Sequence, residues 1–163
     1  MAEIWDLVDK VGNKIGIQID RKDREKIPEG CFLPCAEVWI RVGDDILLTV
    51  RHPGKSEGGR LECPGGGVLA GEDFIDGALR ELFEEVGIIA ERERLAFLGD
   101  EYIGDVYAVS YLLTLGSMPR LNLRQDEVSG YRLARKDSLP KIKDLLTEGT
   151  YRRYVKYREK ICG

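Results

Sequence analysis

The chain has few of the residues that staple a small domain or build a metal cluster. It contains four cysteines and one histidine in 163 residues. Cys31 and Cys35 are spaced like half of a zinc site, and His52 and Cys63 could be imagined completing it. No second short-spaced pair exists, so we expect reduced thiols and no zinc. A domain of this length buries roughly two thirds of its unfolded surface and needs no disulfides.

The sequence also lacks a long hydrophobic run. No apolar stretch approaches the ~20 residues that a membrane-spanning helix needs. The first ten residues, MAEIWDLVDK, carry early acidic side chains and no apolar signal-peptide core. These two absences predict a cytoplasmic protein with no membrane partner.

Positive charge is in slight deficit. The chain has 25 Lys and Arg against 29 Asp and Glu, a net charge of −4. This balance argues against a nucleic-acid backbone as the main partner, although a local site for a small anion can still be positive. The basic stretch TYRRYVKYREKI is better explained by a packed helix, since Tyr151, Tyr154, Val155 and Tyr157 have near-helical spacing. We expect a monomer or a homodimer that does not bind nucleic acid.

Alternating and β-branched segments predict a chain of strands interrupted by helices. Residues 4–19 indicate a hairpin with its turn at 11–13, followed by a charged connector to residue 30. The other predicted strands are 35–42, 46–50, 60–63, 94–103, 105–115 and 128–134, and the late helices are 138–149 and 151–161. This order predicts an α+β fold, a mixed sheet with helices on its faces. We expect one domain, residues 1–163, with the hairpin and connector in 1–30 and the core in 31–163.

A further helix is predicted between residues 73 and 87. Asp73 is a suitable N-cap, Asp76 follows near the positive helix end, and Gly87 suits the C-terminal cap. The apolar residues between them recur at i, i+3, i+4 and i+7, which indicates one buried stripe: Ile75, Ala78, Leu79, Leu82 and Val86.

Three glutamates, Glu81, Glu84 and Glu85, share another face of this helix. Two unit charges ~6 Å apart repel by roughly 0.7 kcal/mol in water, and by about 3 kcal/mol at a dielectric constant of 20. They also lie toward the helix C-terminus, where the helix dipole disfavours anions. A solvated acidic face is the simple alternative. A bound Mg²⁺ or Mn²⁺ would remove the repulsion, because both ions prefer oxygen ligands.

Residues 66–88 carry a pattern found in a known family. Gly66, five residues, Glu72, seven residues and then RELFEEVGI resemble the Nudix box at every specified position. The opening EIWDLVDKVGNKIG is similar to the Nudix subgroup whose layout is similar to isopentenyl-diphosphate isomerase. The resemblance implies an α/β/α sandwich and a pyrophosphohydrolase.

The resemblance also implies roles for individual residues. Glu81, Glu84 and Glu85 would bind Mg²⁺ or Mn²⁺ together with the carbonyl of Gly65. Glu84 would also be catalytic, and Arg80 would orient the glutamates together with Glu72. The implied substrate is a nucleoside diphosphate, a triphosphate or a nucleotide-linked compound.

Residues outside the box complete the expected site. Glu127, in the loop before the last strand, is the expected general base or additional metal ligand, with Asp126 as its alternative. Asp100 and Glu101 are weaker candidates. Arg51 and Lys55 are the expected phosphate-binding cations, with solvated surface charge as the alternative. Four aromatic residues could stack on a base or belong to the core: Trp39, Tyr102, Tyr107 and Tyr131.

Two rival functions remain. An isopentenyl-diphosphate isomerase would carry a catalytic cysteine before the box loop, where this chain has LLTVRHPGK. A Nudix-fold binding module without turnover usually loses box carboxylates, and this chain keeps all of them. We also expect the N-terminal hairpin to add a strand pair and to carry no chemistry, with Asp6 and Asp9 on its surface.

Overall fold

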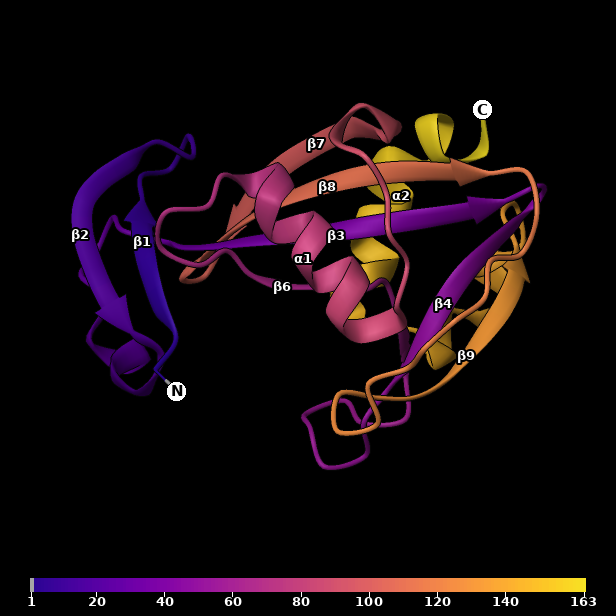
Figure 1. Ribbon diagram of the computed structural model, residues 1–163, viewed down its shortest axis with the longest axis horizontal. Helices are drawn as coiled ribbons and strands as arrows, with labels where there is room; N and C mark the ends of the chain where they lie inside the picture. The colour runs from indigo at the N-terminus through magenta and orange to yellow at the C-terminus, as the bar shows by residue number, and fades with distance from the viewer. Residues whose placement is uncertain (1) are drawn as a thin grey trace.

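The computed structural model describes residues 2–163. They form a mixed sheet with one helix on each face, and an N-terminal hairpin that lies beside this unit (Figure 1). The α-helices are α1 (Phe74–Val86) and α2 (Glu148–Cys162), and the 3₁₀ helices are η1 (Arg21–Lys26), η2 (Arg92–Arg94) and η3 (Leu139–Leu145). The strands are β1 (Ile4–Val8), β2 (Lys14–Asp20), β3 (Leu33–Val42), β4 (Asp45–Arg51), β5 (Leu61–Glu62), β6 (Gly65–Gly67), β7 (Leu95–Ile103), β8 (Val106–Leu115) and β9 (Val128–Arg135).

The main sheet has the strand order β5-β4-β3-β8-β7, with β6 paired to β3 and β9 paired to β4. Strands β3 and β8 are parallel, while the other pairs are antiparallel. The expected mixed sheet is therefore confirmed. The β3–β8 register places Cys35 beside Ala108 and Glu37 beside Ser110.

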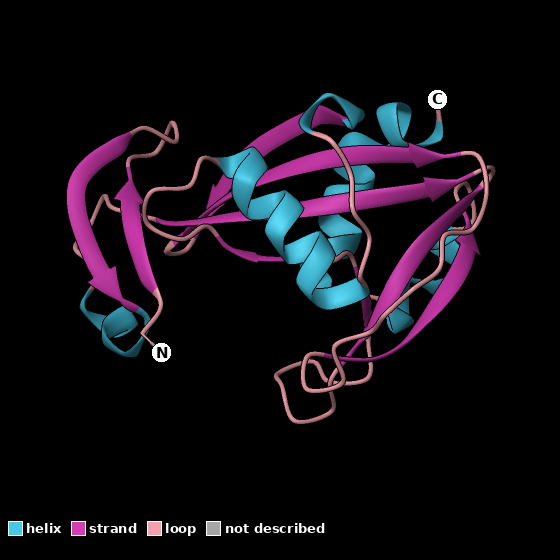
Figure 2. Cartoon of the chain, viewed as in Figure 1, coloured by secondary structure: helices cyan, strands magenta, loops and turns pink. Residues whose placement is uncertain are grey.

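Helices α1 and α2 cover opposite faces of this sheet (Figures 1 and 2). Successive side chains of a strand point to opposite faces, so β3 contributes to two cores. Val38 and Ile40 pack in the cluster that includes Ala78, Leu82 and Val86 of α1. Trp39 packs in the other cluster, with Tyr154, Tyr157 and Ile161 of α2. This layering confirms the expected α+β sandwich.

The N-terminal hairpin forms its own two-stranded sheet, β1 and β2, as the sequence predicts. It is tied to the loop that leads into α1. The backbone N–H of Ala70 donates to the carbonyl of Ile4 at 2.7 Å, and that of Gly71 donates to the carboxylate of Asp6 at 2.9 Å. The hairpin is thus a brace for residues 67–71, which precede the helix with the glutamates.

Three local expectations need correction. The strand predicted over 60–63 is shorter, Leu61–Glu62, and a further strand that was not predicted, Gly65–Gly67, pairs with β3 as β6. Residues 139–145 form a kinked 3₁₀ helix, in which Ile142 departs from helical geometry. Val155 is 58% exposed, because it lies about 100° around α2 from the buried Tyr154. Within residues 2–163, no helix combines the length and the hydropathy that a bilayer crossing requires.

An ion-pair cluster holds α2 against β7. The Glu101 carboxylate lies 3.0 Å from Arg152, 3.6 Å from Arg153 and 3.8 Å from Lys156. Burial opposes its charge, but these three cations outweigh burial and lower the pKa of Glu101 below 4.5. Glu101 is therefore occupied in a structural contact, and the structure does not support its weak candidacy for the active site.

This cluster gives a pH-dependent prediction for Glu101→Gln. A carboxylate with a lowered folded pKa stabilises the protein above its unfolded pKa, and this stabilisation is lost as the pH falls through the folded value. We expect the variant to lose about 1 kcal/mol at pH 7, or roughly 2–4 °C in Tm. The two proteins should converge near pH 3 in thermal melts. An equal difference at both pH values would contradict this assignment.

Candidate active site

The helix with the glutamates is built as its sequence predicts. Asp73 caps α1 by accepting from the N–H of Asp76 at 2.7 Å, and Asp76 accepts in return from the N–H of Asp73 at 3.2 Å. Gly87 ends the helix with a φ of 75°, a left-handed conformation that favours glycine. These caps fix where the helix begins and ends, and so fix the direction of its acidic face.

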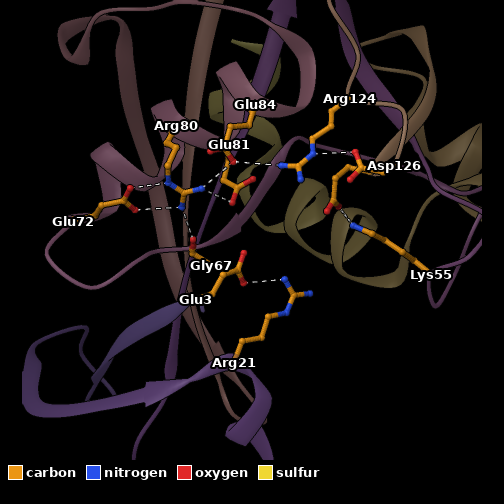
Figure 3. A network of polar contacts seen from close by, with 11 residues as sticks. Glu3, Arg21, Lys55, Gly67, Glu72, Arg80, Glu81, Glu84, Arg124 and Asp126 are labelled. Atoms are coloured by element: carbon orange, nitrogen blue, oxygen red, sulfur yellow. Dashed lines mark hydrogen bonds and ion pairs between the residues drawn. The ribbon is translucent and has the colours of Figure 1, made fainter. Parts of the chain in front are cut away.

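The acidic face of α1 opens into a cavity of about 350 Å³. The cavity brings together most of the predicted site residues: Arg51, Lys55, Gly65, Glu81, Glu84, Glu85 and Glu127. Glu72 and Arg80 do not line it and lie beside the acidic face, where Arg80 links Glu72 to Glu81 and Glu84 by hydrogen bonds (Figure 3). The cavity therefore combines clustered carboxylates with several cations.

Arg80 joins the box loop to the acidic face. Its guanidinium donates to Glu72 at 2.7 and 3.2 Å, and to the carbonyl of Gly67 at 2.8 Å. On the other side it donates to Glu81 at 3.0 Å and to Glu84 at 3.2 Å. The planar, five-donor guanidinium suits this role, because it can satisfy several acceptors in fixed directions.

A side chain at Gly66 would have to displace the carboxylate of Glu81. A Cβ built there would lie 2.6 Å from Oε1 of Glu81, closer than non-bonded atoms approach. The absence of a side chain lets the strand β6 backbone run directly beside the acidic face of α1. Residues 65–67 thereby line the same cavity as the carboxylates.

The buried part of the acidic face holds carboxylates whose charges are only partly compensated by nearby cations. Glu85 is only 8% exposed, and burial raises its pKa to about 9, with the charges of Glu81 and Glu62 adding to the effect. Burial also raises the pKa of Glu81, although Arg80 opposes this. Like charges held close in a poorly solvated site favour protonation or a bound cation.

The loop of residues 116–127 delivers Glu127 to this cavity. Its backbone caps the end of α1, where Asn122 donates to the carbonyl of Val86 at 2.8 Å and Arg124 donates to that of Glu85 at 2.9 Å. The side chain of Glu127 pairs with Lys55 in the cavity. Asp126 instead pairs with Arg124 at 2.9 Å, with a side chain 68% exposed. The two acids lie in a turn, in which the N–H groups of Glu127 and Val128 donate to the carbonyl of Arg124, and this turn directs their side chains to different partners.

The donor set of the cavity fits a hard divalent cation. Glu81, Glu84, Glu85 and Glu127 offer only carboxylate oxygens, and for the buried Glu85 the charge of Lys55 offsets only part of the cost of burial. In residues 2–163, no three His, Cys, Asp or Glu side chains are already gathered as a ligand set. The reason is that Arg80 occupies Glu81 and Glu84 while Lys55 occupies Glu127. Side-chain rotations would be needed for these oxygens to converge on an ion.

Several residues that line the cavity were not predicted from the sequence. Glu62, on β5, pairs with Arg51 at 3.0 Å, and burial raises its pKa. From the N-terminal segment come Glu3, Trp5, Arg21 and Arg24, so the hairpin does shape this cavity. Arg124 approaches Glu84 at 3.8 Å (Figure 3). A carboxylate in a short strand directly before the glycine-rich segment is a usable signal for Glu62, while the other contacts depend on tertiary folding.

The remaining candidates have other surroundings. Nδ1 of His52 accepts a hydrogen bond from the N–H of Gly54 at 3.0 Å, so the imidazole stabilises the local turn. Cys31, Cys35, Cys63 and Cys162 are free thiols. Trp39 and Tyr107 are buried in the core, whereas Tyr102 and Tyr131 are about half exposed. None of these four aromatic residues lines the carboxylate cavity, so base stacking by them has no support here.

Known proteins share both the sequence pattern and the fold. An RNA pyrophosphohydrolase from Novosphingobium aromaticivorans is 32% identical over 89 residues, which cover 49% of this chain and 55% of that protein. The chain thus matches about half the length of this curated relative.

Solved structures extend the fold comparison. A MutT Nudix hydrolase from Burkholderia pseudomallei has a TM-score of 0.61 at 24% identity, covering 77% of this chain and 96% of the other. A bifunctional NMN adenylyltransferase/ADP-ribose pyrophosphatase from Francisella tularensis, complexed with AMP and a Mn ion, has a TM-score of 0.69 at 21% identity. It covers 88% of this chain and 45% of the other. The Nudix domain model matches residues 33–155. The chain therefore belongs to the Nudix family.

Proposed function

We propose that this protein is a Mg²⁺- or Mn²⁺-dependent pyrophosphohydrolase that cleaves a diphosphate linkage in a nucleoside diphosphate, a triphosphate or a nucleotide-linked compound. The observation that carries the proposal is the single cavity lined by Glu81, Glu84 and Glu85 on one side and by Arg51 and Lys55 on another. Carboxylates alone would repel a diphosphate, and cations alone would bind it without activating water. Their combination suits a metal-assisted reaction.

Glu81, Glu84, Glu85 and the carbonyl of Gly65 would hold the metal. The ion would neutralise charge on the diphosphate and increase the acidity of bound water. Arg51 and Lys55 would bind the phosphate oxygens, because phosphate attracts cations that can donate hydrogen bonds. Arg80, anchored by Glu72, would hold Glu81 and Glu84 in place. Positioning and electrostatics of this kind provide most of the rate in phosphoryl transfer.

Glu127 is the proposed acceptor of the proton from the attacking water. Its carboxylate pairs with Lys55, and both side chains line the cavity. A general base must reach its water directly or through one other water. When phosphate attracts Lys55, the carboxylate of Glu127 becomes free to accept that proton.

A substrate panel tests the proposed reaction. Nucleoside diphosphates, triphosphates and nucleotide-linked diphosphates should release phosphate or a monophosphate with Mg²⁺ or Mn²⁺, and not with EDTA. RNA with a 5′-triphosphate belongs in the panel, because a relative with 32% identity is an RNA pyrophosphohydrolase. If no compound is cleaved with either metal, the proposal is wrong and a binding module replaces it.

The Glu127→Gln variant tests the proposed base. We expect its kcat to fall about 100-fold, within the range for loss of a general base. Asp126→Asn is the matched control, because Asp126 is adjacent and acidic, is 68% exposed and does not itself line the cavity. Steady-state kinetics should leave this control within about twofold of the unaltered protein. Equal losses in both variants, or none in Glu127→Gln, would exclude Glu127 as the base.

A further inference from the structure

A second cavity, of about 280 Å³, lies beside the carboxylate cavity. The two cavities share wall residues, including Arg51, Glu62 and Gly66. Other residues of its wall come from β3, β8 and α2, including Glu37, Ala108 and Arg153. A ligand whose phosphates occupy the carboxylate cavity could therefore extend its other end into this one.

The two carboxylate oxygens of Glu37 differ in their hydrogen bonds to the protein. Its Oε1 accepts from Trp39 Nε1 at 2.9 Å, Ser110 Oγ at 2.8 Å and Arg153 Nε at 2.6 Å. In the part of the chain that the structure describes, no hydrogen bond reaches Oε2 of Glu37. The residue is 8% exposed and lines the second cavity. Oε2 is not among the fully buried side-chain atoms that lack a partner in residues 2–163, so it is open to the cavity, where a ligand or water can donate to it.

Arg153 adds donors beside that acceptor. Its Nε is used by Glu37, and its Nη1 lies 3.6 Å from Glu101. Burial opposes the charge of Arg153, but Glu37 outweighs it and raises the pKa of the guanidinium. Gly149 leaves room for this group, since a Cβ there would lie 3.1 Å from Nη1. One wall of the cavity thus presents an acceptor next to a permanently charged donor.

We propose that the second cavity binds the nucleobase of the substrate, and that Glu37 is a specificity-determining residue that accepts an N–H hydrogen bond from the base on Oε2. This inference rests on the proposed function, because it assigns the group attached to the diphosphate. Adenine, guanine, cytosine and uracil each place an N–H donor beside an oxygen or ring-nitrogen acceptor. That edge complements the carboxylate of Glu37 and the guanidinium of Arg153. The cavity volume is close to the lower end of ligand pockets, which suits one base and not a whole nucleotide.

A purely structural role for Glu37 is the competing explanation, since it links β3, β8 and α2. The Glu37→Gln variant separates the two roles. Three donors converge on Oε1, so the amide oxygen must take that position and the NH₂ group must take the position of Oε2. The cavity-facing acceptor then becomes a donor of nearly the same shape. A structural role predicts lower stability but an unchanged preference for substrates that carry a base.

The experiment compares kcat/KM for the four common nucleoside diphosphates with kcat/KM for ribose 5-diphosphate, which lacks a base. We expect the ratio to fall about 10- to 100-fold in Glu37→Gln, as for loss of a buried hydrogen bond that becomes unsatisfied. Glu101→Gln is the matched control, because it makes the same change on the other side of Arg153 and lies outside the second cavity. This control should keep the ratio within twofold.

Two further measurements keep the test decisive. If Glu37→Gln does not fold, Ala108→Leu fills the same cavity from β8 and should lower the same ratio. Calorimetric binding of nucleoside monophosphates, against ribose 5-phosphate, gives a readout without hydrolysis. Base-dependent binding that requires Glu37, without any hydrolysis, would support the inference and overturn the proposed reaction. Hydrolysis with an unchanged ratio in Glu37→Gln and in Ala108→Leu would overturn the inference and leave the reaction intact.

Discussion

Glu85→Gln should abolish most hydrolysis while the metal-free fold survives. Glu85 is the most buried of the three clustered glutamates, and it lines the carboxylate cavity. Glutamine keeps the shape but removes a negative ligand. If the lost ligand charge costs the transition state about 3 kcal/mol, the rate falls roughly 100-fold or more. Steady-state kinetics at saturating Mg²⁺ measure this loss, and Glu84→Gln should show a similar one.

The stability of the same variant should move in the other direction or stay level. Burial and neighbouring carboxylates raise the pKa of Glu85 to about 9, so the metal-free protein already disfavours its charge. Glutamine resembles the protonated form and removes the repulsion from Glu81 and Glu62. We expect the metal-free Tm to be equal or higher. A large fall in the metal-free Tm would show that the carboxylate is structural.

A second measurement links Glu85 to the ion without using activity. A ligand that binds only the folded state raises the Tm with its concentration. Mg²⁺ should therefore stabilise the unaltered protein more than Glu85→Gln. Glu91→Gln is a suitable control, since Glu91 is exposed and lies outside the cavity. Identical Mg²⁺-dependent shifts in all three proteins would exclude Glu85 as a ligand.

The features predicted best from the sequence are those set by local chemistry. Asp73 and Gly87 act as caps, because capping depends on side chains and backbone within a few residues. The 3.6-residue spacing places Glu81, Glu84 and Glu85 on one face in any α-helix. The hairpin β1–β2 likewise follows from alternation and a turn. The location of the acidic cluster could therefore be derived before any tertiary contact was known.

The features that sequence reasoning missed depend on contacts between distant segments. Glu37 and Arg153 are 116 positions apart, yet they are joined at 2.6 Å across β3 and α2. Trp5 lines the carboxylate cavity because the hairpin packs on residues 67–71. No periodicity or motif specifies such pairs. The prediction that Val155 packs on the domain is wrong. Neighbouring residues of a helix point in directions about 100° apart, and approximate helical spacing does not show which of two neighbours faces the core.

The contacts of Arg80 with the box loop and with α1 predict that substitutions of this residue are poorly tolerated. Its guanidinium contacts acceptors in three directions: Glu72, the carbonyl of Gly67, and the Glu81–Glu84 pair. Lysine keeps the charge but has a single ammonium centre, so it cannot reach all three sets. Without this link, the loop loses its connection to the acidic face, and Glu81 and Glu84 lose their common partner.

We therefore expect Arg80→Lys to lose activity and stability together. A displacement of catalytic groups by about 1 Å can cost 100-fold in rate, so kcat should fall by roughly that factor. Loss of several partly buried charge-assisted hydrogen bonds should lower the free energy of unfolding by about 2 kcal/mol, or roughly 4–8 °C in Tm. Arg92→Lys is the matched control, because Arg92 pairs with Asp73 and Asp76 at the exposed N-terminal end of the same helix. Kinetics and thermal melts of the two variants separate the cases. If Arg80→Lys behaves like Arg92→Lys, the guanidinium does not position the glutamates, and charge alone is sufficient at residue 80.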